Sequence, residues 1–427
     1  MSLNPVRSHL RKPPHVLTFG WELAPLLSGG LGVACAGIVK GLGELGVSTT
    51  FVLPRVPPEL SVTTAVDVRA AGAYVRANDV IEINTPLAAY DGPTEYVGRA
   101  IAGGAMAHPG ERSALYGADL YSEVARYGLA AGRIAADVAH DVIHCHDWMT
   151  FDAGIRARAI SGRPLIVHVH STELDRSGGY GGNTEIEERE RRGIAAADCV
   201  VAVSEFTKRK IVEAYGTAPE RITVVHNAID RDVAPVTPQP FADGRPVVLF
   251  LGRITVQKGP EHFLEAASKV IAHEPRALFV VAGSGDMFPY VVERTAKLGL
   301  AANFLFAGFL KGDDIARAYA SADVYVMPSV SEPFGLTPLE AMRQGTPVIV
   351  SRQSGVSEVI RHCLKVDFWD TDALAEKILA VIRHRPLADE LTHAAAEDLD
   401  RISWRQAARR LLDVYTSLIP TMEQSPR

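Results

Sequence analysis

The segment that most constrains the fold is residues 324–350, where an apolar run, a polar loop and a helix-forming run follow one another. Val324–Met327 is short, apolar and partly β-branched, which is typical of a buried strand. After the loop, Thr337 and Pro338 begin the helix-forming run, with the proline in the first turn, where its missing N–H has no cost. A strand, a glycine-bearing loop and a helix start in this order predict an α/β unit with an anion site.

The same loop offers groups for a phosphate and for hydroxyls. We expect the backbone N–H groups of Phe334, Gly335 and Leu336 to face an anion, with the positive end of the helix dipole behind them. Glu332 precedes this loop and Glu340 lies inside the helix. Carboxylates have no electrostatic use beside a phosphate, so we expect both to accept hydrogen bonds from hydroxyls. Phosphate and hydroxyls together indicate a nucleotide sugar.

Two cations follow another strand of this half of the chain. Arg253 and Lys258 lie in the segment GRITVQKG, directly after Val247–Leu251. The fork of a guanidinium group and the compact charge of an ammonium group both suit a diphosphate. Further along, Gly283 and the pair Phe309 and Leu310 come after the next two strands, and we expect them to line the nucleotide pocket.

Strands and helices alternate twice along the chain, which predicts two parallel sheets. The proline-rich residues 231–246 separate the two series and are interpreted as a linker. We therefore predict an α/β protein with an N-terminal domain of residues 1–235 and a C-terminal domain of residues 236–403. A chain of 427 residues fits two such domains.

The first strand, at residues 16–19, is followed by a loop that ends in Gly29 and Gly30. Ligands of open α/β sheets bind at the carboxyl ends of strands, and glycines let a backbone approach a ligand closely. A plain tight turn is the alternative interpretation. The helix that follows has an apolar stripe at alternating steps of three and four residues: Leu31, Cys35, Ile38, Leu42 and Leu45.

The segment HCHDW contains His146 and Asp147 at the end of a predicted strand. A metal site is an alternative here, but neighbours on a strand point to opposite faces and no further ligand group stands out nearby, so we predict none. We assign both residues to a loop on the acceptor side. His170 ends the strand LIVHVH and is expected at the active edge of the sheet, whereas His168 is interpreted as a structural group. The charges of residues 185–197 are interpreted as a solvated helix face.

The segment SEPFGLTPLEAM, with Glu332 and Glu340 eight positions apart, resembles the signature of retaining glycosyltransferases of family 4 and of the related glycogen and starch synthases. The segment GRITVQKG resembles the phosphate clamp of the same family. The resemblance implies a GT-B architecture, two Rossmann-like domains facing across a cleft, in which the final helix, within residues 404–427, packs back on the first domain. It also implies that His170 contacts the donor sugar.

In that family the reaction needs no metal and no bound cofactor. The resemblance implies that Arg253, Lys258 and the loop before Thr337 stabilise the departing diphosphate, while Glu332 holds the sugar and Glu340 the ribose. We expect a hexose, first of all glucose, to move from a nucleoside-diphosphate sugar to a carbohydrate or other hydroxyl acceptor, such as an α-glucan. The chain departs from glycogen synthases at Leu27, where they have a lysine. A mannosyl- or sucrose-type transferase, a catalytically weak nucleotide-sugar-binding protein and, less favoured, a sugar-nucleotide epimerase are the alternatives.

Composition limits the partners and the location. The net charge of −6 gives no general attraction to nucleic acid, and no apolar run is long enough to span a membrane, although peripheral contact stays open. Four cysteines without paired spacing and a basic N-terminus without a following apolar segment predict a cytoplasmic protein with reduced thiols.

Overall fold

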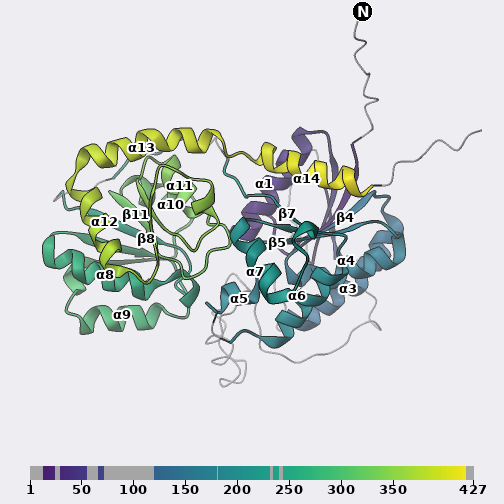
Figure 1. Ribbon diagram of the computed structural model, residues 1–427, viewed down its shortest axis with the longest axis horizontal. Helices are drawn as coiled ribbons and strands as arrows, with labels where there is room; N and C mark the ends of the chain where they lie inside the picture. The colour runs from purple at the N-terminus through teal and green to yellow at the C-terminus, as the bar shows by residue number, and fades with distance from the viewer. Residues whose placement is uncertain are drawn as a thin grey trace, which may run out of the picture.

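In the computed structural model, residues 13–24, 29–54, 66–71, 120–179, 181–230, 234–239 and 244–419 are described here. They form two α/β domains, each built on a parallel sheet (Figure 1), as the sequence predicts. Leu27, where the chain departs from glycogen synthases, lies outside the described residues. No helix of the described residues is long and apolar enough to cross a bilayer.

The first domain has a sheet with the order β3-β2-β1-β4-β5-β6-β7 among its described strands. The strands are β1 (His15–Phe19), β2 (Ser48–Leu53), β3 (Val66–Ala70), β4 (Val142–His146), β5 (Leu165–Val169), β6 (Cys199–Ala202) and β7 (Ile222–Val224). The helices are α1 (Gly30–Glu44), α3 (Leu120–Asp137), α4 (Trp148–Ser161), α5 (Glu173–Arg176), α6 (Thr184–Ala196) and α7 (Glu205–Tyr215). The central strands β1, β4 and β5 are almost wholly buried, as expected for a parallel sheet covered by helices on both faces.

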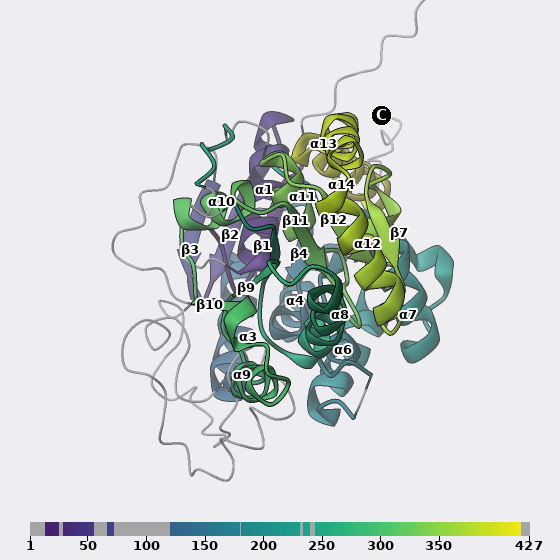
Figure 2. The same cartoon turned by 90° about the vertical axis from the view of Figure 1, so that its left-hand side faces the viewer.

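The second domain has a sheet with the order β10-β9-β8-β11-β12-β13. Its strands are β8 (Val247–Leu251), β9 (Leu278–Ala282), β10 (Phe304–Gly308), β11 (Val324–Met327), β12 (Val348–Ser351) and β13 (Leu364–Val366). Its helices are α8 (Pro260–His273), α9 (Phe288–Lys297), α10 (Asp313–Ala320), α11 (Thr337–Arg343), α12 (Thr371–Arg383) and α13 (Arg385–Asp400). Figure 2 views the molecule from this domain, where α8 and α12 lie side by side and pack together.

The chain returns to the first domain at its C-terminal end. Helix α13 runs along the second domain, and α14 (Trp404–Leu418) lies against α1 of the first domain (Figure 1). The contact depends on two glycines of α1, since a Cβ atom on Gly37 would lie 2.1 Å from the Trp404 ring and one on Gly41 2.4 Å from the Trp404 carbonyl oxygen. The predicted stripe of α1 is buried at Leu31, Cys35, Ile38 and Leu42, and Leu45 is partly buried against the core that contains Ile38 and Leu42.

Candidate active site

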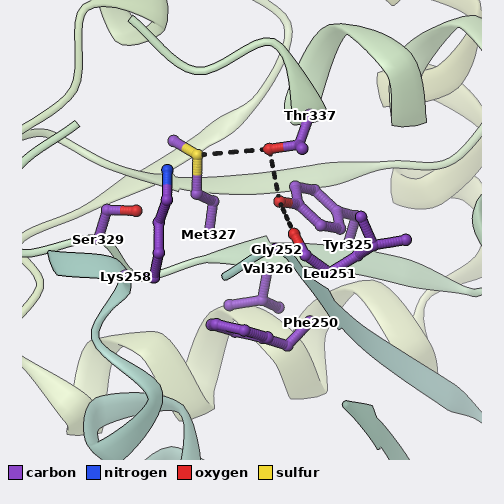
Figure 3. A pocket seen from close by; sticks show the side chains of 9 residues that line it. All are labelled: Phe250, Leu251, Gly252, Lys258, Tyr325, Val326, Met327, Ser329 and Thr337. Atoms are coloured by element: carbon purple, nitrogen blue, oxygen red, sulfur yellow. Dashed lines mark hydrogen bonds between the residues drawn. The ribbon is translucent and has the colours of Figure 1, made fainter. Parts of the chain in front are cut away.

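The candidate site of the second domain lies at the carboxyl ends of β8 and β11. The chain builds outward from β8 through β9 to β10 and then returns to place β11 on the other side of β8. The loops after β8 and β11 therefore diverge at a point where the strand order reverses, and open α/β sheets bind ligands at such points. Side chains and backbone from both strand ends line a pocket there, with the Lys258 side chain rising beside Met327 and Ser329 (Figure 3).

A lysine and a glutamate meet in this site. Lys258 ends a 3₁₀ turn, Val256–Lys258, and its Nζ lies 2.5 Å from Oε2 of Glu332. The hydroxyl of Ser329 donates to the same carboxylate oxygen at 3.2 Å. Glu332 is only 6% exposed, so its charge is compensated mainly by these two donors. Gly259 has a φ of +64° and passes so close to the Pro328 carbonyl that a Cβ atom would lie 2.2 Å from it, which fixes the lysine turn against the end of β11.

The other cation is more exposed. Arg253 donates from Nη2 to Oε1 of the buried Gln257 at 3.1 Å, and the arginine itself lies on the surface. Gly283, at the end of β9, packs against this loop, because a Cβ atom there would lie 1.8 Å from the Gly252 carbonyl oxygen. At the end of β10, Phe309 is 56% exposed and Leu310 is partly buried. The strand ends thus place the predicted phosphate and nucleotide residues along one edge of the sheet.

The loop before α11 wraps around Glu332. Gly335 has a φ of +100°, and a Cβ atom there would lie 3.1 Å from Cγ of Glu332, so a side chain would crowd the glutamate. Phe334 is buried, and Leu336 is the N-cap of α11. The hydroxyl of Thr337 accepts a hydrogen bond from the Tyr325 hydroxyl at 2.8 Å, which joins the start of the helix to β11.

Glu340 lies one turn into α11. The Tyr319 hydroxyl donates to its Oε2 at 3.0 Å. Burial raises the pKa of this carboxyl group, and the hydrogen bond from Tyr319 opposes that rise. One carboxylate oxygen is thus held by the protein, and a carboxylate has further acceptor sites that suit a ligand hydroxyl.

In the first domain, Gly29 is the N-cap of α1 and Gly30 its first residue, both exposed. A Cβ atom on Gly29 would lie 2.7 Å from Oε2 of Glu22, whereas one on Gly30 would meet nothing within 4 Å among the described residues. The Glu22 carboxylate is the end of a flexible side chain and can shift, so neither glycine is fixed by contact with backbone, and Gly30 leaves open space for an approaching ligand.

His170 follows β5 and is 9% exposed. Its backbone N–H donates to Oδ1 of Asp147 at 2.6 Å, and its Nε2 lies 2.9 Å from Nδ1 of His146. Asp147 has a φ of +59°, the one positive value for a non-glycine residue in the described ranges, and burial raises its pKa to about 7. His146 and Asp147 are 0% and 1% exposed. Both contact His170 and support it, and their assignment to the acceptor side stays a prediction.

A hydrogen-bond network joins the two domains beside Glu332, and the sequence did not predict it. Asp175 of α5 accepts from Nζ of Lys210 at 2.7 Å and from the hydroxyl of Ser331 at 2.6 Å. Lys210 also donates to the Ser331 hydroxyl at 2.6 Å. Burial alone would raise the pKa of Asp175, but Lys210 and the hydrogen bonds lower it overall. Ser331 directly precedes Glu332, so the first domain holds the glutamate loop in place.

The charged helix α6 is not simply a solvated face, and this prediction was wrong at one position. Glu190 is 2% exposed and accepts from Nη2 of Arg176 at 2.7 Å, while Nε of the same arginine donates to Glu173 at 2.9 Å. The i,i+4 periodicity could not reveal this, because Arg176 lies on the separate helix α5. The predicted exposed pairing does occur at Glu185 and Arg189.

Known proteins resemble the chain along both of its halves. The family model "Glycosyltransferase Family 4" matches residues 28–233, and the model "Glycosyl transferases group 1" matches residues 237–398. An uncharacterized glycosyltransferase of Methanocaldococcus jannaschii is 30% identical, over 92% of this chain and 96% of that protein. The glycogen synthase of Mycobacterium tuberculosis is 24% identical over 94% of each chain. Among solved structures, sucrose-phosphate synthase from Thermosynechococcus elongatus has a TM-score of 0.69 at 19% identity, covering 95% of this chain and 99% of that one.

The two parallel-sheet domains have the GT-B architecture, and the family models and the relative from Methanocaldococcus jannaschii show that the chain is a glycosyltransferase. Within that class the matches along both halves settle the family. The chain belongs to glycosyltransferase family 4.

Proposed function

We propose that the protein is a retaining glycosyltransferase that moves a hexose, with glucose as the first candidate, from a nucleoside-diphosphate sugar to a hydroxyl acceptor. The observation that carries the proposal is the pair of Lys258 and Glu332 at the shared edge of β8 and β11. The lysine cation can bind a diphosphate, and the adjacent carboxylate can accept hydrogen bonds from sugar hydroxyls. A nucleoside-diphosphate sugar requires both groups side by side.

In the proposed reaction, negative charge grows on the diphosphate as the bond to the sugar breaks. Lys258, Arg253 and the loop at Gly335 stabilise that charge, and preorganised donors of this kind often contribute more to catalysis than any other effect. Glu332 accepts from sugar hydroxyls, and Glu340 from the ribose. His170 contributes from the first domain, since α5, which follows it, packs against the lysine turn. We propose that no metal ion or cofactor takes part at the diphosphate.

Glucan synthesis is the first acceptor hypothesis, because the glycogen synthase of Mycobacterium tuberculosis matches over nearly the whole chain. A sucrose-type acceptor is the second, since sucrose-phosphate synthase shares the fold over 95% of this chain. Both hypotheses use the same binding site for the sugar nucleotide and differ in the acceptor substrate.

The test is product analysis by mass spectrometry, with ADP-, UDP- and GDP-glucose each offered beside maltooligosaccharides, and beside fructose 6-phosphate. Growth of the oligosaccharides by one hexose supports the glucan hypothesis, and a phosphorylated disaccharide supports the sucrose type. NMR of the new anomeric proton tests retention, because a retaining enzyme gives the α-product from an α-linked donor.

Two variants test the assigned residues. Lys258→Ala and Glu332→Gln should each lower kcat on the order of a hundredfold. Lys269→Ala is the matched control, since this lysine lies on α8 and pairs with Asp372 at the surface. Wild-type protein that binds a sugar nucleotide but never turns it over would support the binding-protein alternative, and full activity in both variants would contradict the assigned roles.

A further inference from the structure

Four histidines form one buried cluster in the first domain. His144 and His146 are two residues apart on β4, and His168 and His170 are two apart at the end of β5, so each pair shares a face of the sheet. His146 pairs with His168 in the parallel register, which places all four on the same face. The rings of His144 and His146 are 4.4 Å apart, and those of His168 and His170 are 4.2 Å apart. The sequence argument against further ligands near HCHDW was therefore wrong.

The ring nitrogens of this cluster are short of partners. Nε2 of His144, Nε2 of His146 and both ring nitrogens of His168 are buried without a hydrogen-bond partner among the described residues. These three side chains are 0% exposed. A buried polar atom without a partner is destabilising, so several in one place require an explanation.

The ring nitrogens that do have partners make the hydrogen bonds that usually orient metal-binding histidines. The hydroxyl of Tyr415 on α14 lies 2.8 Å from Nδ1 of His144, and Nε2 of His170 lies 2.9 Å from Nδ1 of His146. If both Nδ1 atoms carry the proton and donate, both Nε2 atoms keep a free lone pair. Metal-binding histidines are held in this way, with the second ring nitrogen donating to a neighbouring acceptor.

Burial also acts on the pKa values of these rings. Burial lowers the pKa of His144 and His168 well below the usual value, and it lowers the pKa of His146 to about 3. Metals bind the uncharged form of imidazole, and burial favours that form.

We infer that His144, His146 and His168 bind one transition-metal dication of the zinc type between the first sheet and α14. Their candidate ligand atoms lie within 4.8 Å of one another. Around a tetrahedral ion with Zn–N bonds of about 2.0–2.1 Å these nitrogens would be about 3.4 Å apart, so adjustments on the order of an ångström close the site. Imidazole ligands suit zinc, copper, nickel or cobalt, whereas magnesium and calcium prefer oxygen.

Cys35, His146 and His170 form a second group with the same spacing, and because both groups need His146, the two groups are alternatives and do not each hold an ion at the same time. The all-histidine group is preferred, because Nε2 of His170 already contacts His146. The metal would hold Tyr415, and with it α14, against the sheet. It would also fix the proton of His146 on Nδ1, which makes Nε2 of His170 an acceptor and leaves its proton on Nδ1.

The first test uses wild-type protein without an affinity tag, produced with zinc and washed with a mild chelator. Elemental analysis should find one zinc ion per chain, and X-ray absorption should find three nitrogen ligands at about 2.0–2.1 Å. The cobalt-substituted protein should show a tetrahedral spectrum without a thiolate band. A chain without stoichiometric metal after growth with zinc, cobalt, nickel or copper would overturn the inference, and a sulfur ligand would overturn this ligand set.

The second test uses variants whose folding is checked by circular dichroism. His168→Leu should lose the bound ion and the rise in Tm that zinc gives the wild type, while Tyr415→Phe should weaken binding by about tenfold or more. His262→Leu is the control, since this histidine lies half-buried against Phe368 in the second domain and should leave metal content unchanged. Retention of one ion per chain in His168→Leu would overturn the assignment. If that variant does not fold, the absorption measurement on the wild type decides alone.

Discussion

The substitution Arg176→Met removes the cation from a buried ion network. The guanidinium group contacts two carboxylates, Glu173 at 2.9 Å and Glu190 at 2.7 Å, and all three side chains are 3% exposed. Without the arginine, two negative charges stay buried. Glu190 keeps the hydroxyl of Tyr215 and the backbone N–H of Glu173 as donors, so the loss is not complete.

The size of the effect follows from these contacts. Removing one partner of a buried ion pair costs about 3–5 kcal/mol, because the remaining charge is left without compensation. We expect a loss of about 4 kcal/mol in the free energy of unfolding of the first domain. In a domain of this size 1 kcal/mol changes Tm by about 2–4 °C, so Tm should fall by roughly 8–16 °C.

The assay is urea and thermal unfolding followed by circular dichroism, with calorimetry to separate the two domains. Arg176→Lys is the matched variant: it keeps the charge but cannot hold both carboxylates in a fork, and it should lose about 1–2 kcal/mol. Adding Glu190→Gln to Arg176→Met should recover part of the loss, because one buried charge is removed with the cation.

The stability of Arg176→Met should depend on pH in a defined direction. Burial already raises the pKa of Glu190 in the wild type, although Arg176 opposes that rise. Without Arg176 the folded protein favours the protonated carboxyl group more strongly, so the variant should gain stability relative to wild type as the pH falls from 7 to 5. A loss under about 1 kcal/mol at pH 7, well below the 3–5 kcal/mol of a broken buried pair, would refute the reasoning.

Three further changes test other parts of the structure. Asp175→Asn removes the carboxylate charge that accepts a hydrogen bond from Ser331 beside the glutamate loop. We expect kcat to fall about tenfold with the donor KM nearly unchanged, because a charge-assisted hydrogen bond of about 1.5–3 kcal/mol is lost. Equal changes in kcat and in the donor KM would count against this positioning role. Gly41→Ala places a methyl group where the Trp404 carbonyl oxygen approaches. The free energy of unfolding in urea should fall by about 1–3 kcal/mol, and an unchanged urea midpoint would show that α14 can shift freely. Glu340→Gln should raise donor KM about tenfold by weakening a charge-assisted hydrogen bond, measured with saturating acceptor, and an unchanged donor KM would place the ribose elsewhere.

The sequence predicted the local units of the second domain closely. Val247–Leu251 and Val324–Met327 are strands at the predicted bounds, because an apolar run of this length, rich in β-branched residues and bounded by turn residues, favours a buried strand over a helix. Strand β13 was missed, since a three-residue strand at a sheet edge leaves too short a pattern. The contact between Lys258 and Glu332 joins residues from two predicted loops, and both lie at strand ends as expected.

Pairing across elements was beyond the sequence. The spacing of Gly37 and Gly41 is a signal for a closely packed helix, but only the fold shows that α14 is the partner. The link from Asp175 to Ser331 joins residues 156 positions apart, and no local pattern records it.

Local propensity and hydrophobic period thus determined the strands, the helices and the order of the chemical groups along this chain, since these depend on neighbours within a few residues. The tertiary structure alone decided which strands became neighbours, and therefore which buried groups met. His146 stands beside His168 because β4 pairs with β5 in one register, and a shift of one residue would turn those side chains to opposite faces of the sheet.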